Sequence, residues 1–325
     1  MKGIHSITVQ NKRLHYQFEL KRNITVIRGD SATGKTTLID MIQEYYEDGE
    51  ESGILLQSDK ECVVVSSNRR WKQELAGVED SIVFIDEGNK FIFGVEFASY
   101  IKSTDNYYVI VTREGIPTLP YSVKEIYGIK NSGKYGNLKQ IYNEFYPFYT
   151  VKEDNQIEKK EMIITEDSNS GYQFFESVSN EHGIKCETAN GKSNIFSKIE
   201  YLNKKKEIQK ILVIADGAAF GAEIEKIEKM RSINNQIDLY LPESFEWMIL
   251  ESGILEGNKI KEILKNPADY IECKEYFSWE RFFTELLVKE TSETQFPYLK
   301  SKLNEYYKKG QVRDKILSVM KKDLT

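Results

Sequence analysis

The chain of 325 residues is 40% hydrophobic and 30% charged, with a formal net charge of −6. These proportions are typical of a soluble globular protein of about two domains, and no run approaches the roughly 20 apolar residues of a membrane-spanning helix. The first residues lack the apolar core of a signal peptide, so we expect a cytoplasmic protein with no membrane partner. The negative net charge argues against a generally basic nucleic-acid-binding surface, although not against a local basic patch.

The first notable feature is a phosphate-binding pattern, G-x-x-x-x-G-K-[ST], between Gly29 and Thr36. The run NITVIRG before it predicts a buried strand, and KTTLIDMIQEYYE after it has helical spacing. Strand, glycine loop and helix in this order surround phosphate oxygens with backbone N–H groups. Lys35 would then reach the terminal phosphates of ATP, and Thr36 would ligate Mg²⁺. The predicted ATP-binding residues are Gly29, Asp30, Ser31, Ala32, Thr33, Gly34, Lys35, Thr36 and Thr37, together with Asp86 and Arg113.

Three further strands are predicted before residue 115, and each ends in charged residues. The strand in SIVFIDEG ends at Asp86, which would bind the water shell of the metal, and Glu87, which would face the γ-phosphate and polarise the attacking water. The strand in YYVIVTRE runs to Arg113, a candidate sensor of the γ-phosphate. The strand in CVVVSSNRRW runs into Arg69 and Arg70, which are either phosphate clamps or ordinary surface charges.

The glycine loop and the Asp86–Glu87 pair resemble those of the ABC and AAA+ ATPases. The resemblance implies a P-loop ATPase domain over residues 1–149, closed by a predicted hairpin in YGIKNSGKYGNLKQIYNEFYPFY. Between Thr37 and Ser81 there is no LSGGQ-like signature, so this part resembles a minimal ATPase core and does not predict dimerisation of the ABC kind. We still expect an oligomer.

A second α/β segment follows a charged linker at residues 150–160. Strands in MIITED, KILVIADG and QIDLYLPES alternate with helices in GYQFFESVSNEHG and AEIEKIEKMRS. Such alternation predicts a mostly parallel sheet. We therefore expect a second α/β domain over residues 161–258.

Acidic residues follow each of these three strands. Glu166 and Asp167 follow the first, Asp216 the second, and Glu243 and Glu246 the third. Ligands bind outside the carboxyl ends of strands in open parallel sheets, so these acids could share one Mg²⁺ and support phosphodiester cleavage. The alternative is that they are solvated or cap helices, with a helix beginning at Ser244. The predicted catalytic residues are Glu87, Glu166, Asp216 and Glu246, and the predicted metal ligands are Thr36, Asp86, Glu166, Asp216 and Glu246.

A Glu after the first strand and an Asp after a later one resemble the Toprim fold. A P-loop ATPase followed by a Toprim-like domain resembles the overcoming-lysogenization-defect nucleases and the anti-phage systems that pair an ATPase with a Toprim-like effector. The resemblance implies that Glu166 is the first-strand Glu and Asp216 the first Asp of D-x-D. Position 218 is Ala, so cleavage would need Glu243 or Glu246 as the additional ligand.

The remainder, residues 259–325, is predicted to be helical, with segments WERFFTELLVKE, YLKSKLNEYYKKG and RDKILSVMKK. Between Lys300 and Thr325, eight Lys or Arg residues face three Asp or Glu. This excess of positive charge would suit nucleic-acid phosphates or a solvated helix face.

Two functions follow from these expectations. The first is an ATP- and metal-dependent nuclease or nuclease-like effector in anti-phage defence, with nucleic acid as its partner. The second is an ATPase sensor or scaffold whose degenerate Toprim-like domain binds a partner effector without cleaving nucleic acid. A small-molecule kinase is less well supported, because Glu87 suits hydrolysis better than transfer and no acceptor-pocket signature is present.

Overall fold

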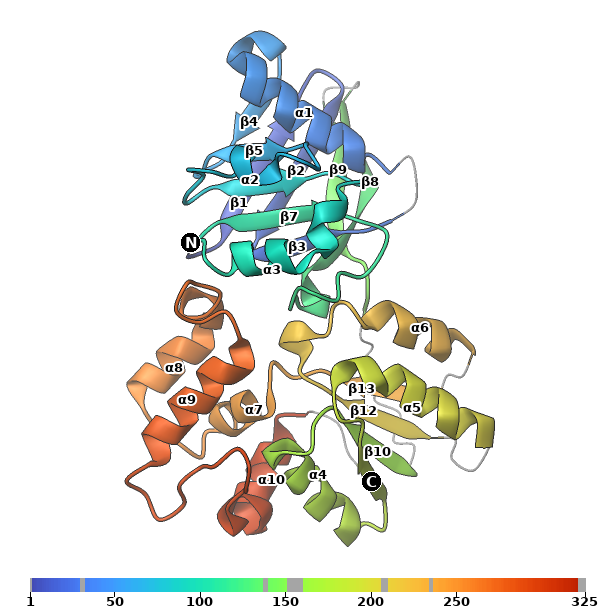
Figure 1. Cartoon of the computed structure of the whole chain (residues 1–325), viewed down its shortest axis with the longest axis vertical. Helices are drawn as coiled ribbons and strands as arrows, with labels where there is room; N and C mark the ends of the chain where they lie inside the picture. Colours follow the sequence, from blue (N-terminus) through green and yellow to red (C-terminus); the bar gives the residue numbers. More distant parts are fainter. Residues whose placement is uncertain are drawn as a thin grey trace. The chain divides into compact units, whose positions relative to one another are not determined.

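The computed structural model describes residues 2–29, 33–136, 140–150, 160–205, 210–233 and 236–320, without the side chains of 132–136. The chain divides into two compact units (Figure 1). The first comprises Met1–Thr150 and Ala268–Phe277, and the second comprises Val151–Pro267 and Ser278–Thr325. Both units combine a β-sheet with helices, which confirms the expected α/β class.

The first unit is built on a mixed sheet whose described strands follow the order β4-β1-β2-β9-β8-β3-β7-β6-β5. Neighbours from β8 to β5 are parallel, whereas β8–β9, β1–β2 and β1–β4 are antiparallel pairs and β2–β9 is parallel. The hairpin expected after residue 126 is thus present as β8 and β9. The strands are β1 (His5–Gln10), β2 (Leu14–Leu20), β3 (Ile24–Ile27), β4 (Leu55–Gln57), β5 (Cys62–Val65), β6 (Ile82–Ile85), β7 (Tyr107–Val111), β8 (Ile126–Gly136) and β9 (Gln140–Pro147).

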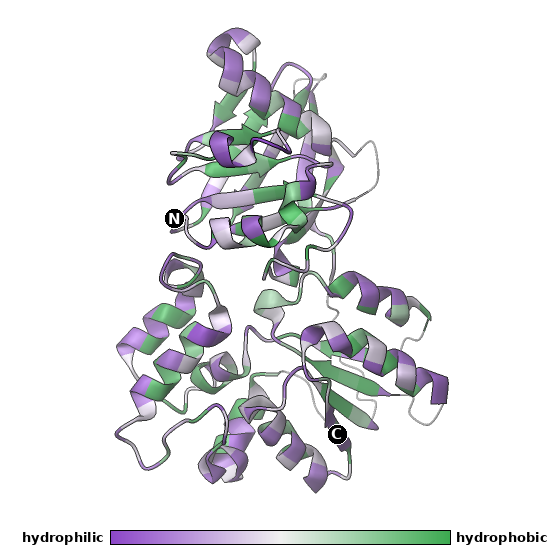
Figure 2. Ribbon diagram, viewed as in Figure 1, coloured by the Kyte–Doolittle hydropathy of each residue, from purple (hydrophilic) through white to green (hydrophobic). Residues whose placement is uncertain are grey.

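The four parallel strands β3, β5, β6 and β7 are buried at every position. Strands buried on both faces carry mostly apolar side chains, which explains the abundance of Val and Ile in these four strands (Figure 2). Helix α1 (Lys35–Asp48) contacts β5, β1 and β4. It buries Leu38, Ile39 and Ile42, which the helical spacing placed on one side, while Tyr45, the fourth residue expected there, is only partly buried. The shorter helices of this unit are α2 (Trp71–Glu74) and α3 (Val95–Ile101).

A segment from the C-terminal half, Ala268–Phe277, packs with the first unit. Asp269 Oδ1 accepts a hydrogen bond from the backbone N–H of Gly3 at 2.8 Å, and Glu272 Oε2 accepts one from the N–H of Asn23 at 2.7 Å. Asn23 directly precedes β3. The segment therefore supports the strand that leads into the glycine loop, which its place within the expected helical region did not indicate.

The second unit contains a parallel sheet with its described strands in the order β11-β10-β12-β13. The sequence predicted β10 (Met162–Thr165), β12 (Ile211–Ile214) and β13 (Ile237–Tyr240). It also predicted α4 (Ser170–Glu181) and α6 (Ile224–Ile233). It did not identify β11 (Lys185–Thr188) or α5 (Lys192–Lys205). The strand was missed because β11 has no fully buried position and no apolar run.

The C-terminal helices are α7 (Phe245–Glu251), α8 (Asn258–Lys265), α9 (Trp279–Thr291) and α10 (Gly310–Ser318). The helix expected over YLKSKLNEYYKKG is wrong. Residues 297–304 have no helical structure, and only a 3₁₀ turn follows at Glu305–Lys308. Hydrogen bonds to other elements hold the chain there instead, as described below. Residues 321–325 of the basic tail lie outside the described residues.

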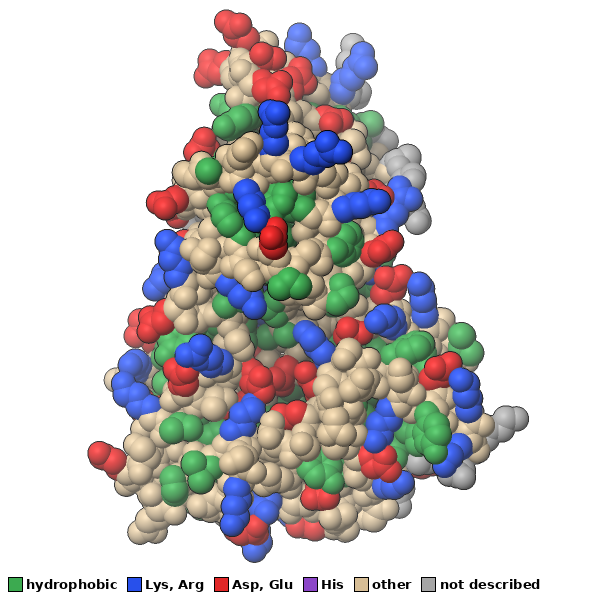
Figure 3. Space-filling model, in the orientation of Figure 1, with side chains coloured by type: hydrophobic (Ala, Val, Ile, Leu, Met, Phe, Trp, Pro, Cys, Tyr) green, Lys and Arg blue, Asp and Glu red, His purple; other side chains and the backbone are tan. Residues whose placement is uncertain are grey.

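Acidic and basic side chains are interspersed over the face of the molecule drawn in Figure 3. That face has no broad field of one sign. No helix in the described ranges is long and apolar enough to cross a membrane.

Candidate functional site

The glycine loop connects β3 to α1, as the sequence predicted. Gly34 caps α1 with φ of 89°, in the left-handed region that glycine tolerates best. A Cβ at this position would also lie 2.8 Å from the hydroxyl oxygen of Tyr16. The loop geometry therefore depends on glycine for two separate reasons. Asp30, Ser31 and Ala32, which we also expected to bind ATP, lie outside the described residues.

The Lys35 side chain is buried and folds back onto the loop. Its ammonium donates hydrogen bonds to the carbonyl oxygen of Gly29 at 2.8 Å and to Oγ1 of Thr33 at 3.0 Å. Thr36 and Thr37 are exposed in the first turn of α1. A phosphate at this helix terminus could exchange with the two oxygen acceptors and would meet the positive end of the helix dipole.

The acids after β6 lie at the same edge of the sheet as the glycine loop, because β3, β7 and β6 are parallel neighbours in that order. The N–H of Glu87 donates to Oδ1 of Asp86 at 2.7 Å. Burial raises the pKa of Asp86 and the hydrogen bond from the Glu87 N–H lowers it. The charges of Asp40 and Glu87 raise this pKa, and Lys35 lowers it. Asp86 thus lies within electrostatic range of the loop lysine, where a divalent cation would favour its ionised form.

Arg113 lies beyond the end of β7 and forms an ion pair with Glu87. Glu87 and Arg113, which were both expected near the γ-phosphate, are therefore in contact with each other. Arg69 and Arg70 are exposed on the turn before α2. Their positions favour the interpretation that they are ordinary surface charges.

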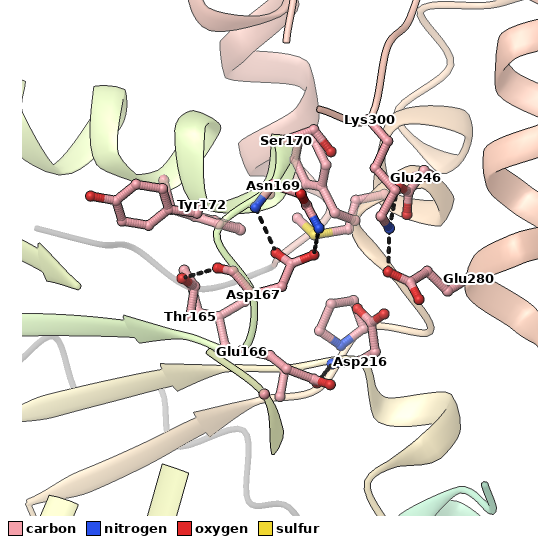
Figure 4. A pocket seen from close by; sticks show the side chains of 18 residues that line it. Thr165, Glu166, Asp167, Asn169, Ser170, Tyr172, Asp216, Glu246, Glu280 and Lys300 are labelled. Atoms are coloured by element: carbon pink, nitrogen blue, oxygen red, sulfur yellow. Dashed lines mark hydrogen bonds and ion pairs between the residues drawn. The ribbon is translucent and has the colours of Figure 1, made fainter. Parts of the chain in front are cut away.

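The second unit has a pocket of about 340 Å³ at the carboxyl ends of its strands (Figure 4). Glu166 follows β10 and Asp216 follows β12, and Oε2 of Glu166 accepts a hydrogen bond from the N–H of Asp216 at 3.0 Å. Directly after β12 the chain packs closely against Leu241, since a Cβ on Gly217 would lie 2.4 Å from the carbonyl oxygen of Leu241. The polar and charged residues that line the pocket include Glu166, Asp167, Asp216, Glu246, Glu280 and Lys300.

Glu246 reaches the pocket from the first turn of α7. That helix begins at Ser244, whose hydroxyl accepts the N–H of Trp247 at 3.1 Å, so the capping expected at this residue is present. Glu246 is nevertheless more than a capping residue, because its buried carboxylate accepts hydrogen bonds from Tyr298 at 2.6 Å and Lys300 at 3.2 Å. Lys300 also pairs with Glu280 of α9.

The other two candidate acids have different surroundings. Asp167 accepts hydrogen bonds from the backbone N–H of Asn169 at 3.3 Å and from its side-chain amide at 2.8 Å. This arrangement orders the turn before α4. Glu243 is buried and is not among the residues that line the pocket. Of the acids after the three strands, Glu166, Asp216 and Glu246 are brought together with Asp167 around one cavity.

The carboxylates of the pocket influence one another. Burial raises the pKa of Asp216 well above its ordinary value, and Glu166, Glu280 and Glu246 raise it further, while Lys300 opposes them. Burial also raises the pKa of Glu166. For Lys300, burial lowers the pKa but Glu246 and Glu280 raise it by more, so the net shift is upward. The pocket therefore disfavours the ionised forms of Asp216 and Glu166 as it stands, and a bound cation would favour them.

Sequence reasoning missed Glu280, Tyr298 and Lys300, because they lie far along the chain from the strand ends. Ser278, the cap of α9, was a local signal for the position of Glu280. No comparable pattern marks Lys300. Among the residues described, no three His, Cys, Asp or Glu side chains are grouped closely enough to hold a metal ion as they stand. By chemistry, the oxygen ligands of the pocket suit Mg²⁺ or Mn²⁺.

Comparison with known proteins finds no protein-family model that matches the chain and no significantly similar sequence among curated proteins.

Proposed function

We propose that this protein binds and hydrolyses ATP in its first unit and that its second unit is a Toprim-like, metal-dependent nuclease acting in anti-phage defence. The observation that carries the ATPase proposal is that Lys35, Asp86 and the Glu87–Arg113 pair all follow the carboxyl ends of the parallel strands β3, β6 and β7, next to the glycine loop. Ligand sites in open α/β sheets form at such edges.

In the proposed ATPase reaction, the Lys35 ammonium exchanges its contacts with Gly29 and Thr33 for the β- and γ-phosphate oxygens. Thr36 and Asp86 would hold Mg²⁺, which neutralises phosphate charge when bound. Glu87 orients the attacking water and accepts its proton. Arg113 is close enough to Glu87 to position that carboxylate and to meet charge developing on the γ-phosphate.

For the second unit, the supporting observation is that Glu166, Asp216 and Glu246 line one pocket. These residues are not grouped closely enough to hold a metal ion as they stand, so they would have to close around it. A metal ion held there would activate water and stabilise the leaving oxygen of a phosphodiester. The contribution of the three acids is to fix the cation at the carboxyl edge of the sheet. Burial first and then the neighbouring carboxylates raise the pKa of Asp216, and a divalent cation would oppose both effects by favouring the ionised form.

Two variants of the full chain test these proposals separately. Lys35→Ala should abolish tight ATP binding in calorimetry while the protein stays folded, because it removes the cation that faces the phosphates. Asp216→Ala should abolish Mn²⁺-dependent cleavage of DNA or RNA while ATP hydrolysis continues. Equal ATP affinity in Lys35→Ala and its parent would refute the loop as the binding site.

The second candidate function is an ATPase whose second unit binds a partner effector without cleavage. Ala218 stands where the resemblance requires the second Asp. Glu246, the acid that would have to replace this Asp as a ligand, already pairs with Lys300. A parent protein that hydrolyses ATP but cuts neither DNA nor RNA under Mn²⁺ would favour this candidate. Co-purification of one defined protein, released by ATP, would support it further.

A further inference from the structure

Lys300 is held inside the carboxylate pocket of the second unit. Its ammonium contacts Oε1 of Glu246 at 3.2 Å and pairs with Glu280, so it lies between acids from α7 and α9 (Figure 4). The Glu246 side chain is only 2% exposed. A carboxylate this deeply buried is costly without a cation or several hydrogen-bond donors. Lys300 supplies the positive charge that this pocket requires.

Lys300 belongs to the non-helical stretch 297–304. Tyr298 is buried and Leu299 is 54% exposed. Lys300 lies in a turn that the N–H of Lys302 closes on the carbonyl oxygen of Leu299 at 3.2 Å, and its side chain points back toward the pocket. In the helix that the local sequence favours, residues two apart would point to nearly opposite sides. The N–H of Ser170 donates to the carbonyl oxygen of Lys300 at 2.9 Å, and the Ser170 and Tyr298 hydroxyls are hydrogen-bonded at 2.6 Å. The start of α4 thus fixes this stretch against the acids.

We propose that Lys300 is an internal counter-ion that closes this pocket, so that its ammonium and a divalent metal ion bind there in competition. The inference rests on the proposed metal site. Tyr298 and Lys300 both donate to Oε1 of Glu246, so a metal ion ligated by this oxygen would displace at least part of these contacts. A metal ion ligated by the other carboxylate oxygen would still lie close to the ammonium. A divalent ion at Glu166 and Asp216 would also repel the nearby ammonium.

The consequence is that the second unit would be inactive in the structure described here. Metal loading requires the 297–304 stretch to release Lys300, while the sheet that carries Glu166 and Asp216 can stay unchanged. Lys300 and the residues proposed to hold the metal thus belong to different elements, so release of the lysine does not require the sheet to change. A partner that binds residues 297–304 more tightly after Lys300 is released would then raise metal affinity.

The test measures Mn²⁺ binding to the full-length, nucleotide-free protein by calorimetry and by thermal melting. Lys300→Met removes the charge and keeps the side-chain length, and it should bind Mn²⁺ at least about tenfold more tightly than the parent, a difference of about 1.4 kcal/mol. Without metal its Tm should be lower, because Glu246 loses its cation, and Mn²⁺ should restore it. Lys300→Gln, which can still donate a hydrogen bond to Glu246, replaces it if Lys300→Met does not fold.

Lys198→Met is the matched control. Lys198 pairs with Glu187 at 2.7 Å in the same unit, and its side chain is 23% exposed against 29% for Lys300. It does not line the pocket, so its loss should leave Mn²⁺ affinity unchanged. The double variant Lys300→Met/Asp216→Ala should lose the tight binding.

The possible outcomes separate this inference from the proposed function. Asp216-dependent binding with equal affinity in the parent, Lys300→Met and Lys300→Gln would overturn the competition and leave the metal site in place. Absence of binding in all variants would overturn both. Tighter binding that persists in the double variant would place the ion elsewhere and overturn the role of Lys300.

Discussion

Arg113 and Glu87 form an ion pair with 2.5 Å between Nε and Oε1, and this pair joins the segments that follow β7 and β6. Both side chains are partly exposed, at 57% and 32%, so the pair contributes little to stability. The proposed role of the ion pair is to orient the Glu87 carboxylate that activates water. Two variants distinguish these roles.

Glu87→Gln keeps the shape of the side chain but removes its basicity. ATP should therefore bind and persist, with turnover reduced about 10²–10⁴-fold, the usual contribution of a general base. Nucleotide binding by calorimetry and phosphate release by a coupled assay measure the two effects separately. Undiminished turnover would assign water activation to another group.

Arg113→Met should reduce the rate of hydrolysis, because Glu87 loses the partner that orients it, while the fold is unaffected. Lys72→Met is the control, since Lys72 also pairs with a glutamate, Glu96 at 3.0 Å, and is also 57% exposed. Only the arginine variant should change turnover. If both variants hydrolyse ATP at the parental rate, the Arg113–Glu87 pair has no positioning role.

Gly34→Ala should destabilise the protein through both backbone strain and a clash with Tyr16. The left-handed conformation costs a residue with a Cβ about 1–2 kcal/mol, and the 2.8 Å approach to the tyrosine hydroxyl adds to it. Gly88 has a similar φ of 98°, but a Cβ added there would have nothing within 4 Å. Thermal melting should therefore show a larger loss for Gly34→Ala than for Gly88→Ala, and Tyr16→Phe should reduce the difference. Equal losses would show that only the backbone matters.

Asp216→Asn should raise the Tm of the metal-free protein near pH 7. The native pKa of Asp216 is above its unfolded value of about 3.9, so the native state binds this proton more tightly than the unfolded chain. Stability from this group is therefore greatest at low pH and falls as pH rises from about 4 through the native pKa. The variant should lack this part of the pH dependence, with a gain of about 2–4 °C for each kcal/mol. The Tm of both proteins, measured from pH 4 to 8, gives this pH dependence. An identical slope of Tm against pH in the two proteins would contradict the prediction.

Glu272→Ala should destabilise the first unit by about 1–3 kcal/mol, because it leaves the buried N–H of Asn23 without its acceptor. Glu272→Gln retains an acceptor oxygen and should cost much less. Denaturant unfolding of both variants provides the comparison. Equal stability of the alanine variant and the parent would mean that segment 268–277 does not support β3.

The sequence by itself determined those parts of the protein that depend on neighbouring residues. The α/β class, the strand–loop–helix order around Gly34 and the strands β10, β12 and β13 were predictable, because β-branched runs and helical spacing express local preferences. The positions of Glu166 and Asp216 at strand ends followed from the same alternation. Helix α7 was identified from its cap at Ser244.

Only the tertiary structure decided the features that depend on contacts between distant segments. Residues 268–277 pack with the first unit through partners about 250 residues away, such as Asn23. The stretch 297–304 gives up its local helical preference because Tyr298 and Lys300 gain contacts with the buried Glu246. Local propensities amount to a few tenths of a kcal/mol per residue, whereas leaving a buried carboxylate without partners costs several times more. The contacts with the buried carboxylate outweigh local helix propensity, so they decided the conformation of residues 297–304 and placed Lys300 in the pocket.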